Sequence, residues 1–323
     1  IPLIASQMGM MRAVPVAVAL LVAGLAQLGF LYWTLARIDA VPALVWPRLS
    51  DAGRKMWRNF LPAAAGAGGM QINLLIDLIL ASLLPVGAIS WLYYADRVAQ
   101  LPLGIVGIAL GTALLPRLSA AEAGSRPAEV RDSLAEAVGL AGFLVIPAVA
   151  GLVLCGLSIM QGLFVYGAFD ENDAQMAALA LTAYGCGLPG FVMVKILQTA
   201  FYAAGQPGIV LKVSLTTVAI NVAGSLLLMP ILGHVGLALA TAISGIAAAT
   251  IMVVLLARQN RVSAAFLPGL GKIILATAVM GAAVMSLQYG LDHFLHLPAA
   301  FDLVIIVGGA AAVYALMCYS IGA

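Results

Sequence analysis

The sequence has little charge, few cysteines and no recognisable motif for catalysis. Only 9% of its 323 residues are charged and 63% are hydrophobic, whereas soluble domains average roughly 25% charged residues. This composition excludes a water-soluble globular protein. The formal net charge is only +2, so the charge balance gives no reason to expect a nucleic-acid partner.

Residues that carry out chemistry are also scarce. The three cysteines, Cys155, Cys186 and Cys318, lie far apart within apolar runs. In such runs cysteine is typical of packing rather than of a disulfide or a zinc site. No nucleophile beside a base, metal-ligand cluster or nucleotide-binding fingerprint stands out. The sequence therefore gives no indication of an enzyme active site.

Long apolar runs are abundant instead. A helix needs about 20 apolar residues to cross roughly 30 Å of hydrocarbon, and these runs lack the alternation that is typical of barrel strands. The sequence therefore predicts an all-α, polytopic transmembrane helical bundle. Nine runs are long enough to span, near residues 13–36, 57–84, 89–115, 134–157, 174–203, 208–229, 233–257, 271–290 and 302–321.

Positive charge alternates between the loops that join these runs. One alternate set of loops holds nearly all of the Lys and Arg residues, whereas the other set is acidic and has Arg12 as its only cation. The positive-inside rule places the cationic set in the cytoplasm. The predicted cytoplasmic loops are 38–56, 116–133, 204–207 and 258–270.

Two cationic residues lie deep within predicted spans, away from their ends. By the helical rise, Arg97 is about 12 Å from the outer end of its span and Lys195 about 12 Å from the inner end. A charge at this depth is costly unless it faces water or a partner, so both residues indicate a hydrated cavity that accepts an anion. Alternatively, Asp96 pairs with Arg97, although successive helical residues face different ways, and Lys195 snorkels toward the cytoplasm.

Asp77 also lies within a predicted span, and no Lys or Arg is near it in sequence. Asn221 and Thr241 fall at a similar depth on two other spans. Carboxylate, amide and hydroxyl oxygens suit a hard monovalent cation such as sodium. Because Asn and Thr also form hydrogen bonds between membrane helices without any ion, both interpretations remain open.

Two stretches of the chain carry a family resemblance. Residues Gln71 to Ser119 read QINLLIDLILASLLPVGAISWLYYADRVAQLPLGIVGIALGTALLPRLS, which closely resembles the signature region of the MurJ (MviN) lipid II flippases of the MOP exporter superfamily. Residues Phe201 to Val222 read FYAAGQPGIVLKVSLTTVAINV, which is similar to the inner hairpin of a lobe in that superfamily. The resemblance extends over essentially the whole chain.

The resemblance implies a fold with two six-helix lobes around a central cavity and a final helix pair. Residues 1–56 would hold the last helix of the first lobe and a cytoplasmic linker, and residues 57–258 the six-helix second lobe. Residues 265–323 would form the C-terminal pair that lines a groove for a lipid tail. We expect the chain to be a fragment that lacks about five earlier helices, because it starts at Ile1 rather than at Met.

The resemblance also implies a function. The protein would move lipid II, the undecaprenyl-pyrophosphate-linked peptidoglycan precursor, from the inner to the outer leaflet of the bacterial inner membrane by alternating access, without making or breaking covalent bonds. Its contacts would be lipid II and membrane lipids. The family's Asp-Arg pair matches Asp96 and Arg97, so Arg97 is expected to meet the pyrophosphate, with Lys195 as a further cation in the cavity.

A sodium ion is the one cofactor that the resemblance implies. The matching residues here are Asp77, Asn221, Thr241 and the backbone carbonyl of Leu237. A second aspartate of the family's site is replaced by Ser225, which removes one negative charge and weakens the argument for tight binding.

Two other classes of function fit parts of the pattern. A related MOP-type exporter would carry another polyprenyl-linked glycan or a cationic drug, and a drug exporter should favour acids in the cavity over Arg97. A non-transporting membrane scaffold would need only close helix packing, for which Gly104, Gly107 and Gly111 form a suitable small-residue stripe.

Overall fold

The computed structural model describes residues 13–38, 53–54, 57, 60–61, 73–262, 267–294 and 299–321. Helices and short turns account for these ranges, and none of the described residues lies in a strand. The predicted all-α fold is therefore confirmed. The chain divides into two compact units, Ile1–Lys55 and Met56–Ala323, and each is described by itself.

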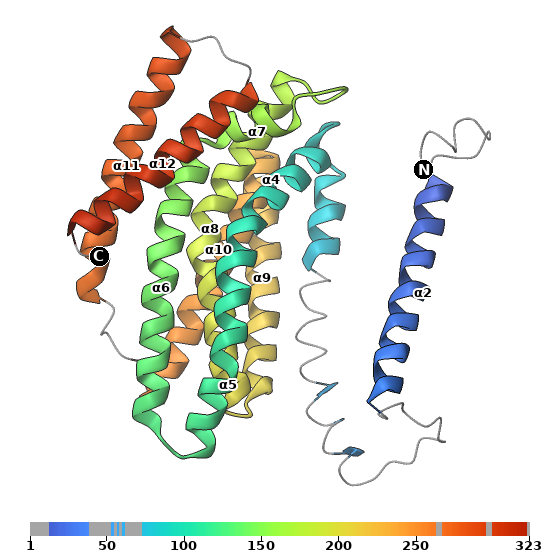
Figure 1. Ribbon diagram of the computed structural model, residues 1–323. Coiled ribbons are helices and arrows are strands. Elements are labelled where there is room, and N and C mark those ends of the chain that lie inside the picture. Colours follow the sequence, from blue (N-terminus) through green and yellow to red (C-terminus); the bar gives the residue numbers. More distant parts are fainter. Residues whose placement is uncertain are drawn as a thin grey trace. The chain divides into compact units, whose positions relative to one another are not determined.

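The first unit contains one helix, α2 (Ala13–Arg37) (Figure 1). Its apolar side chains point in all directions, and none of the residues in its most apolar stretch is buried within the unit. A helix that is hydrophobic all round is typical of a membrane span. In its last turn, the guanidinium of Arg37 lies 4.0 Å from the centre of the Trp33 ring, an arrangement suited to the membrane interface.

Eight helices in the described part of the chain are long and apolar enough to cross a membrane. They correspond to eight of the nine predicted spans, which confirms a multi-pass membrane protein. In the predicted span at 57–84, residues 58–59 and 62–72 lie outside the described residues. Residues 73–84 are described, and residues 73–81 are helical.

The second unit is a bundle centred on the long helix α8, which contacts α4, α5, α6, α7, α9 and α10 (Figure 1). Half of the most apolar stretch of α8 is buried. The elements after residues 73–81 are α4 (Ala88–Pro102), the π-helix η1 (Leu103–Ile108), α5 (Ala109–Ala123), α6 (Pro127–Leu154), α7 (Gly156–Phe164), α8 (Glu171–Ala203), α9 (Pro207–Leu232), α10 (His234–Arg258), α11 (Leu267–Phe294) and α12 (Ala299–Ile321).

Glycines let the backbones of α8 and α10 approach each other closely. A Cβ atom added at Gly187 would lie 2.6 Å from Cα of Ala242, and one added at Gly190 would lie 2.7 Å from the backbone nitrogen of Ile246. Small residues at such contacts are the usual means of packing membrane helices. The backbones of α8 and α10 are therefore tightly packed at Gly187 and Gly190.

Replacement of Gly190 by alanine is expected to destabilise the lobe, because the new methyl group collides with backbone that cannot rotate away. The loss should be about 1–3 kcal/mol, as for overpacking in general, and a thermal shift of the purified protein measures it. Gly151 of α6 is the matched control, since a Cβ there meets nothing within 4 Å. Equal melting temperatures for the two variants would contradict the tight contact.

Three helices end in the same way at one end of the bundle. After α5, α8 and α10 the chain passes through a residue with positive φ: Ser125 (51°), Gly205 (68°) and Asn260 (55°). The next residue then donates its N–H to a carbonyl five residues back, which is the Schellman arrangement. These bonds run from Arg126 to Ala121, from Gln206 to Phe201 and from Arg261 to Leu256.

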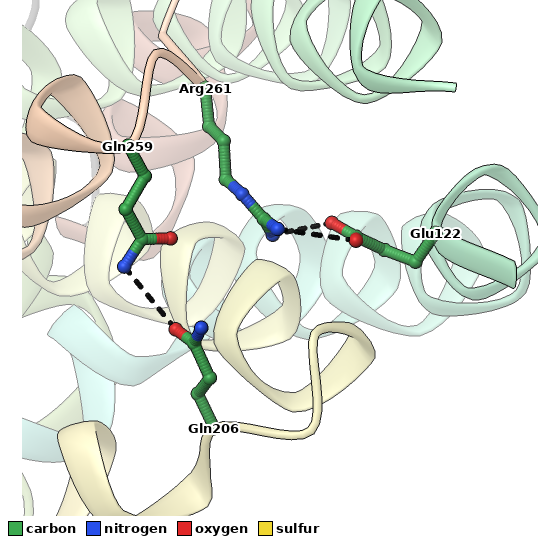
Figure 2. A network of polar contacts seen from close by, with 4 residues as sticks. All are labelled: Glu122, Gln206, Gln259 and Arg261. Carbon is green, nitrogen blue, oxygen red and sulfur yellow. Dashed lines mark hydrogen bonds and ion pairs between the residues drawn. The ribbon is translucent and has the colours of Figure 1, made fainter. Parts of the chain in front are cut away.

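Polar side chains link these three turns to one another. Figure 2 shows that Glu122 accepts hydrogen bonds from both terminal nitrogens of Arg261, with 3.2 Å between Oε2 and Nη2. Beside this pair, Gln259 donates to Oε1 of Gln206 at 3.3 Å. The side chains of Glu122 and Arg261 are only 22% and 21% exposed. We call these four residues the polar clasp.

Truncation of the polar clasp by Glu122→Ala is expected to cost about 1–3 kcal/mol, because a sheltered guanidinium loses its charged acceptor. Glu129→Ala is the matched control: Glu129 pairs with Arg126, but both side chains are about half exposed, and such pairs contribute little. Thermal unfolding of both variants measures the difference. The exchange of charges in Glu122→Arg/Arg261→Glu should recover part of the loss, and no recovery would count against the pairing.

The last two helices attach to one side of the lobe. In the described part of the chain, α11 and α12 contact only each other, α6 and α7. Gln288 of α11 donates to the carbonyl of Leu154 at 3.2 Å, at the point where α6 ends, and the hydroxyl of Tyr314 on α12 donates to the carbonyl of Phe143 at 2.6 Å. Polar tethers therefore fix this pair to α6.

Candidate functional site

Helix α4 carries the cation that the sequence singled out, and aromatic contacts anchor it. Near its start, the indole nitrogen of Trp91 donates to Oδ1 of Asp173 at 2.7 Å. One turn later the Tyr94 ring packs between Phe164 and Phe169, with ring centres 4.7 and 5.1 Å away. Together with the buried face of α4, these contacts hold the helix against α7 and α8.

Arg97 projects from the opposite face of α4. Its side chain is exposed, and its guanidinium lies 4.9 Å from the centre of the Tyr93 ring. Arg97 makes no ion pair with any residue that the structure describes. Asp96 instead accepts a hydrogen bond from the amide of Gln100. The structure therefore shows an available guanidinium rather than an Asp96–Arg97 pair.

Lys195 lies on α8, against the continuation of α4 beyond Pro102. After Pro102, which has no N–H to donate, the chain forms the π-helix η1, and such wide turns are often found at functional sites. A Cβ atom at Gly107 of η1 would lie 3.5 Å from Cγ of Lys195. Arg97 and Gly107 are ten residues apart, or about 15 Å along a helix. The two cations are therefore at different depths.

Asp77 lies in a cluster of side-chain oxygens and amides. The amide of Asn73 donates to Oδ2 of Asp77 at 3.1 Å. The amide orientation of Asn221 that satisfies its neighbours places its nitrogen 3.0 Å from Oδ1 of Asp77 and its oxygen 2.9 Å from the hydroxyl of Thr241. That hydroxyl is 3.0 Å from the carbonyl of Leu237. The structure thus brings together four residues that the sequence proposed and adds Asn73.

Ser225 is the remaining residue that the sequence analysis assigned to this cluster. It lies one turn from Asn221 on α9, and both side chains are fully buried. The Ser225 hydroxyl is a buried group that has no hydrogen-bond partner in the described ranges, which is costly unless something else satisfies it. The donor set of one carboxylate, two amides, two hydroxyls and a carbonyl fits a hard monovalent cation. Among the described residues, no group of three or more His, Cys, Asp or Glu side chains is placed to hold a metal ion, as zinc would need.

Asn73 is the one member of the Asp77 cluster that sequence reasoning did not find. A polar residue four positions before Asp77 was the available signal for Asn73, since such residues share a helix face.

The comparison with protein families matches residues 1–305 to the model described as lipid II flippase MurJ. The chain belongs to the MurJ family. Among curated MurJ proteins, it is 32% identical over 311 residues to the probable lipid II flippase of Rhizobium tropici, covering 94% of this chain and 58% of that protein. It is 33% identical over 250 residues to the corresponding protein of Haemophilus influenzae, covering 74% of this chain and 48% of that protein. The chain thus spans about half the length of these MurJ relatives.

Solved structures show the same fold. A lipid II flippase MurJ in an inward closed conformation matches with a TM-score of 0.70 and 22% identity, over 87% of this chain and 57% of that chain. A MOP superfamily transporter from Pyrococcus furiosus matches with a TM-score of 0.51 and 13% identity, over 80% of this chain and 63% of that chain. The predicted MOP-type architecture of this MurJ family member is therefore confirmed.

Proposed function

We propose that this chain contains the second lobe and final helix pair of a flippase that moves lipid II from the inner to the outer leaflet of the bacterial inner membrane. The observation that carries the proposal is Arg97, an exposed guanidinium within a membrane-spanning helix that no described acid neutralises. Family membership and the shared fold support the assignment. The chemistry of lipid II explains why such a residue is needed.

The barrier to flipping is the loss of water around a sugar, peptide and diphosphate headgroup in hydrocarbon. A hydrated cavity with a fixed cation replaces part of that solvation. The planar guanidinium of Arg97 matches the geometry of phosphate oxygens and donates two parallel hydrogen bonds. Alternating exposure of this cavity to the two sides, by movement of the lobes, would complete transport.

The composition of the Asp77 cluster supports a role for a bound cation in this movement of the lobes. Asp77, Asn221, Thr241, Ser225 and the Leu237 carbonyl would hold a sodium ion, whose single positive charge balances the one carboxylate. These groups come from the helix at 73–81 and from α9 and α10. An ion shared by the three helices favours the conformation in which they lie together.

An apolar groove on the surface of the lobe is the proposed path for the polyprenyl tail. The groove has a volume of ≈ 470 Å³ and lies between α6 and α11, where Val149 and Val153 face Ile274 and Gly281. Apart from Thr277 its lining is apolar, so it suits a hydrocarbon chain better than a polar headgroup. The tail would stay in this lipid-like environment while the headgroup crosses. The loops at 38–56, 116–133, 204–207 and 258–270 would face the cytoplasm.

The rival functions fit the geometry less well. An exporter of cationic drugs needs an available acid in its cavity, yet Gln100 engages Asp96, and Asp77 belongs to the cluster assigned above to a sodium ion. A scaffold has no use for an unpaired cation within a span. The shared fold by itself does not separate these classes of protein. What separates them is whether water reaches the face of α4 that carries Arg97.

Labelling at position 97 tests this directly. In the full-length protein with its native cysteines replaced, an Arg97→Cys variant should react with membrane-impermeant maleimides added from either side, because alternating access exposes the cavity to both. Leu226→Cys on α9, an exposed apolar position, is the control for a lipid-facing site and should stay unlabelled. Protection of position 97 from both sides would refute a transport cavity on this face.

A further inference from the structure

Two side-chain contacts lie next to each other on the exposed face of α4. Tyr93 contacts Arg97, with 4.9 Å from the guanidinium carbon to the ring centre. Gln100 donates a hydrogen bond to Oδ2 of Asp96. Both contacts join residues four positions apart, which share a helix face. One contact therefore involves the cation, and the other involves the acid beside it.

The Gln100 contact decides what Asp96 does. Asp96 adjoins Arg97 in sequence, and the two side chains carry opposite charges. A carboxylate with free oxygens is the natural competitor of a phosphate for a guanidinium. Because the Gln100 amide is neutral, it satisfies one Asp96 oxygen without adding a second cation. The hydrogen-bond donors of Arg97 then remain available for a ligand.

The Tyr93 contact decides where Arg97 points. The Tyr93 ring is 53% exposed and packs edge-on against Tyr94, with ring centres 5.7 Å apart. Tyr94 is in turn fixed by Phe164 and Phe169. The ring under the guanidinium is therefore held through a row of aromatic contacts to α7. Such a platform reduces the conformational entropy that a long arginine side chain loses when it binds a ligand.

We propose that Tyr93 and Gln100 are positioning residues for Arg97: the Tyr93 ring orients the guanidinium, and the Gln100 amide keeps Asp96 from neutralising it, so that the site is ready for a diphosphate. This inference rests on the proposed function. It adds two residues to the site. In it, Asp96 does not bind the substrate: it would compete with the diphosphate for Arg97, and Gln100 prevents this.

Binding of lipid II to the full-length protein in nanodiscs tests the role of Tyr93. Tyr93→Phe keeps the ring and should bind within about 2-fold of the unmodified protein, whereas Tyr93→Leu should bind about 3- to 10-fold more weakly, the range expected for a partly desolvated cation–π contact. The melting temperature should stay unchanged, because the ring is half exposed. Equal weakening by both substitutions, or no weakening by either, would overturn the role of the ring.

The role of Gln100 has its own signature. Gln100→Met keeps the size of the side chain but removes the donor, so Asp96 should pair with Arg97 and lipid II affinity should fall about 5- to 20-fold. The double variant Asp96→Asn/Gln100→Met removes the competing charge and should bind more tightly than Gln100→Met alone. A merely structural role predicts the reverse order, and that result would overturn the inference.

An Arg97→Ala background separates this inference from the proposed function. There, neither Tyr93→Leu nor Gln100→Met should weaken binding further, because both act through Arg97. If Arg97→Ala itself leaves lipid II binding intact, the proposed function fails. If Arg97→Ala weakens binding but Tyr93→Leu and Gln100→Met do not, only the positioning roles fail.

Discussion

Replacement of Arg97 by alanine in the full-length protein is expected to abolish lipid II translocation. Two charge-assisted hydrogen bonds to a diphosphate contribute about 3–6 kcal/mol, so their loss should slow transport by ~100-fold or more. The fold should survive, because the side chain is exposed and forms no ion pair with any described acid. Outward translocation of labelled lipid II in proteoliposomes, with the melting temperature measured in parallel, checks both statements.

Arg97→Lys separates geometry from charge. A lysine keeps the positive charge but loses the planar pair of donors, so it should restore only part of the activity. Arg117→Ala is the matched control, since this arginine is also exposed but pairs with Glu136 at 3.0 Å in a predicted cytoplasmic loop. Transport should persist in that variant. Full transport by Arg97→Ala would show that the guanidinium does not meet the substrate.

Replacement of Asp77 by asparagine is expected to remove any effect of sodium on the protein. The substitution keeps the size of the side chain but deletes the one carboxylate of the cluster, leaving a cation among neutral groups. Sodium should then no longer raise the melting temperature, and any dependence of transport on sodium should disappear. Titration of the thermal shift with sodium chloride, against choline chloride at equal ionic strength, measures the first effect.

Ser225→Asp gives the opposite test at the same place. It adds a second carboxylate one turn from Asn221, where the buried serine hydroxyl has no described partner. Sodium should bind about 10-fold more tightly, because an added charged ligand strengthens a cation site. Choline chloride at equal ionic strength should give no such gain in melting temperature. If sodium stabilises Asp77→Asn as much as the unmodified protein, the cation site is wrong.

Apolar length alone predicted most of the fold, because hydrocarbon leaves helices as the economical way to satisfy the backbone. Local irregularities were not predicted. The span expected at 89–115 continues to Ala123 and contains the π-helix η1, and the span expected at 134–157 breaks at Cys155. Pro102 was a visible signal for the first, but proline shows only that a regular helix is disturbed, and not which wide or tight turn replaces it.

Depth and resemblance together placed Asp77, Asn221 and Thr241 in one cluster, and the structure brings them together. Depth along a helix was enough there because one carboxylate near mid-membrane must find polar neighbours. The same reasoning could not find Asn73 or Gln100, since a polar residue four positions from an acid is common on any helix. Whether Asp96 bonds to Arg97 or to Gln100 depends on rotamers, which sequence spacing does not determine.

The π-helix between Leu103 and Ile108 also affects which way the rest of this helix faces. A wide turn holds one residue more than a turn of regular helix, so it absorbs that residue locally and leaves the helix beyond it facing the same way. In a regular helix, one added residue would rotate everything beyond it by about 100°. Gly107 and Gly111 allow α8 to approach at Lys195 and Thr199, and such a rotation would put bulkier side chains in their place. The wide turn therefore lets this segment carry its extra residue without disturbing the contact with α8.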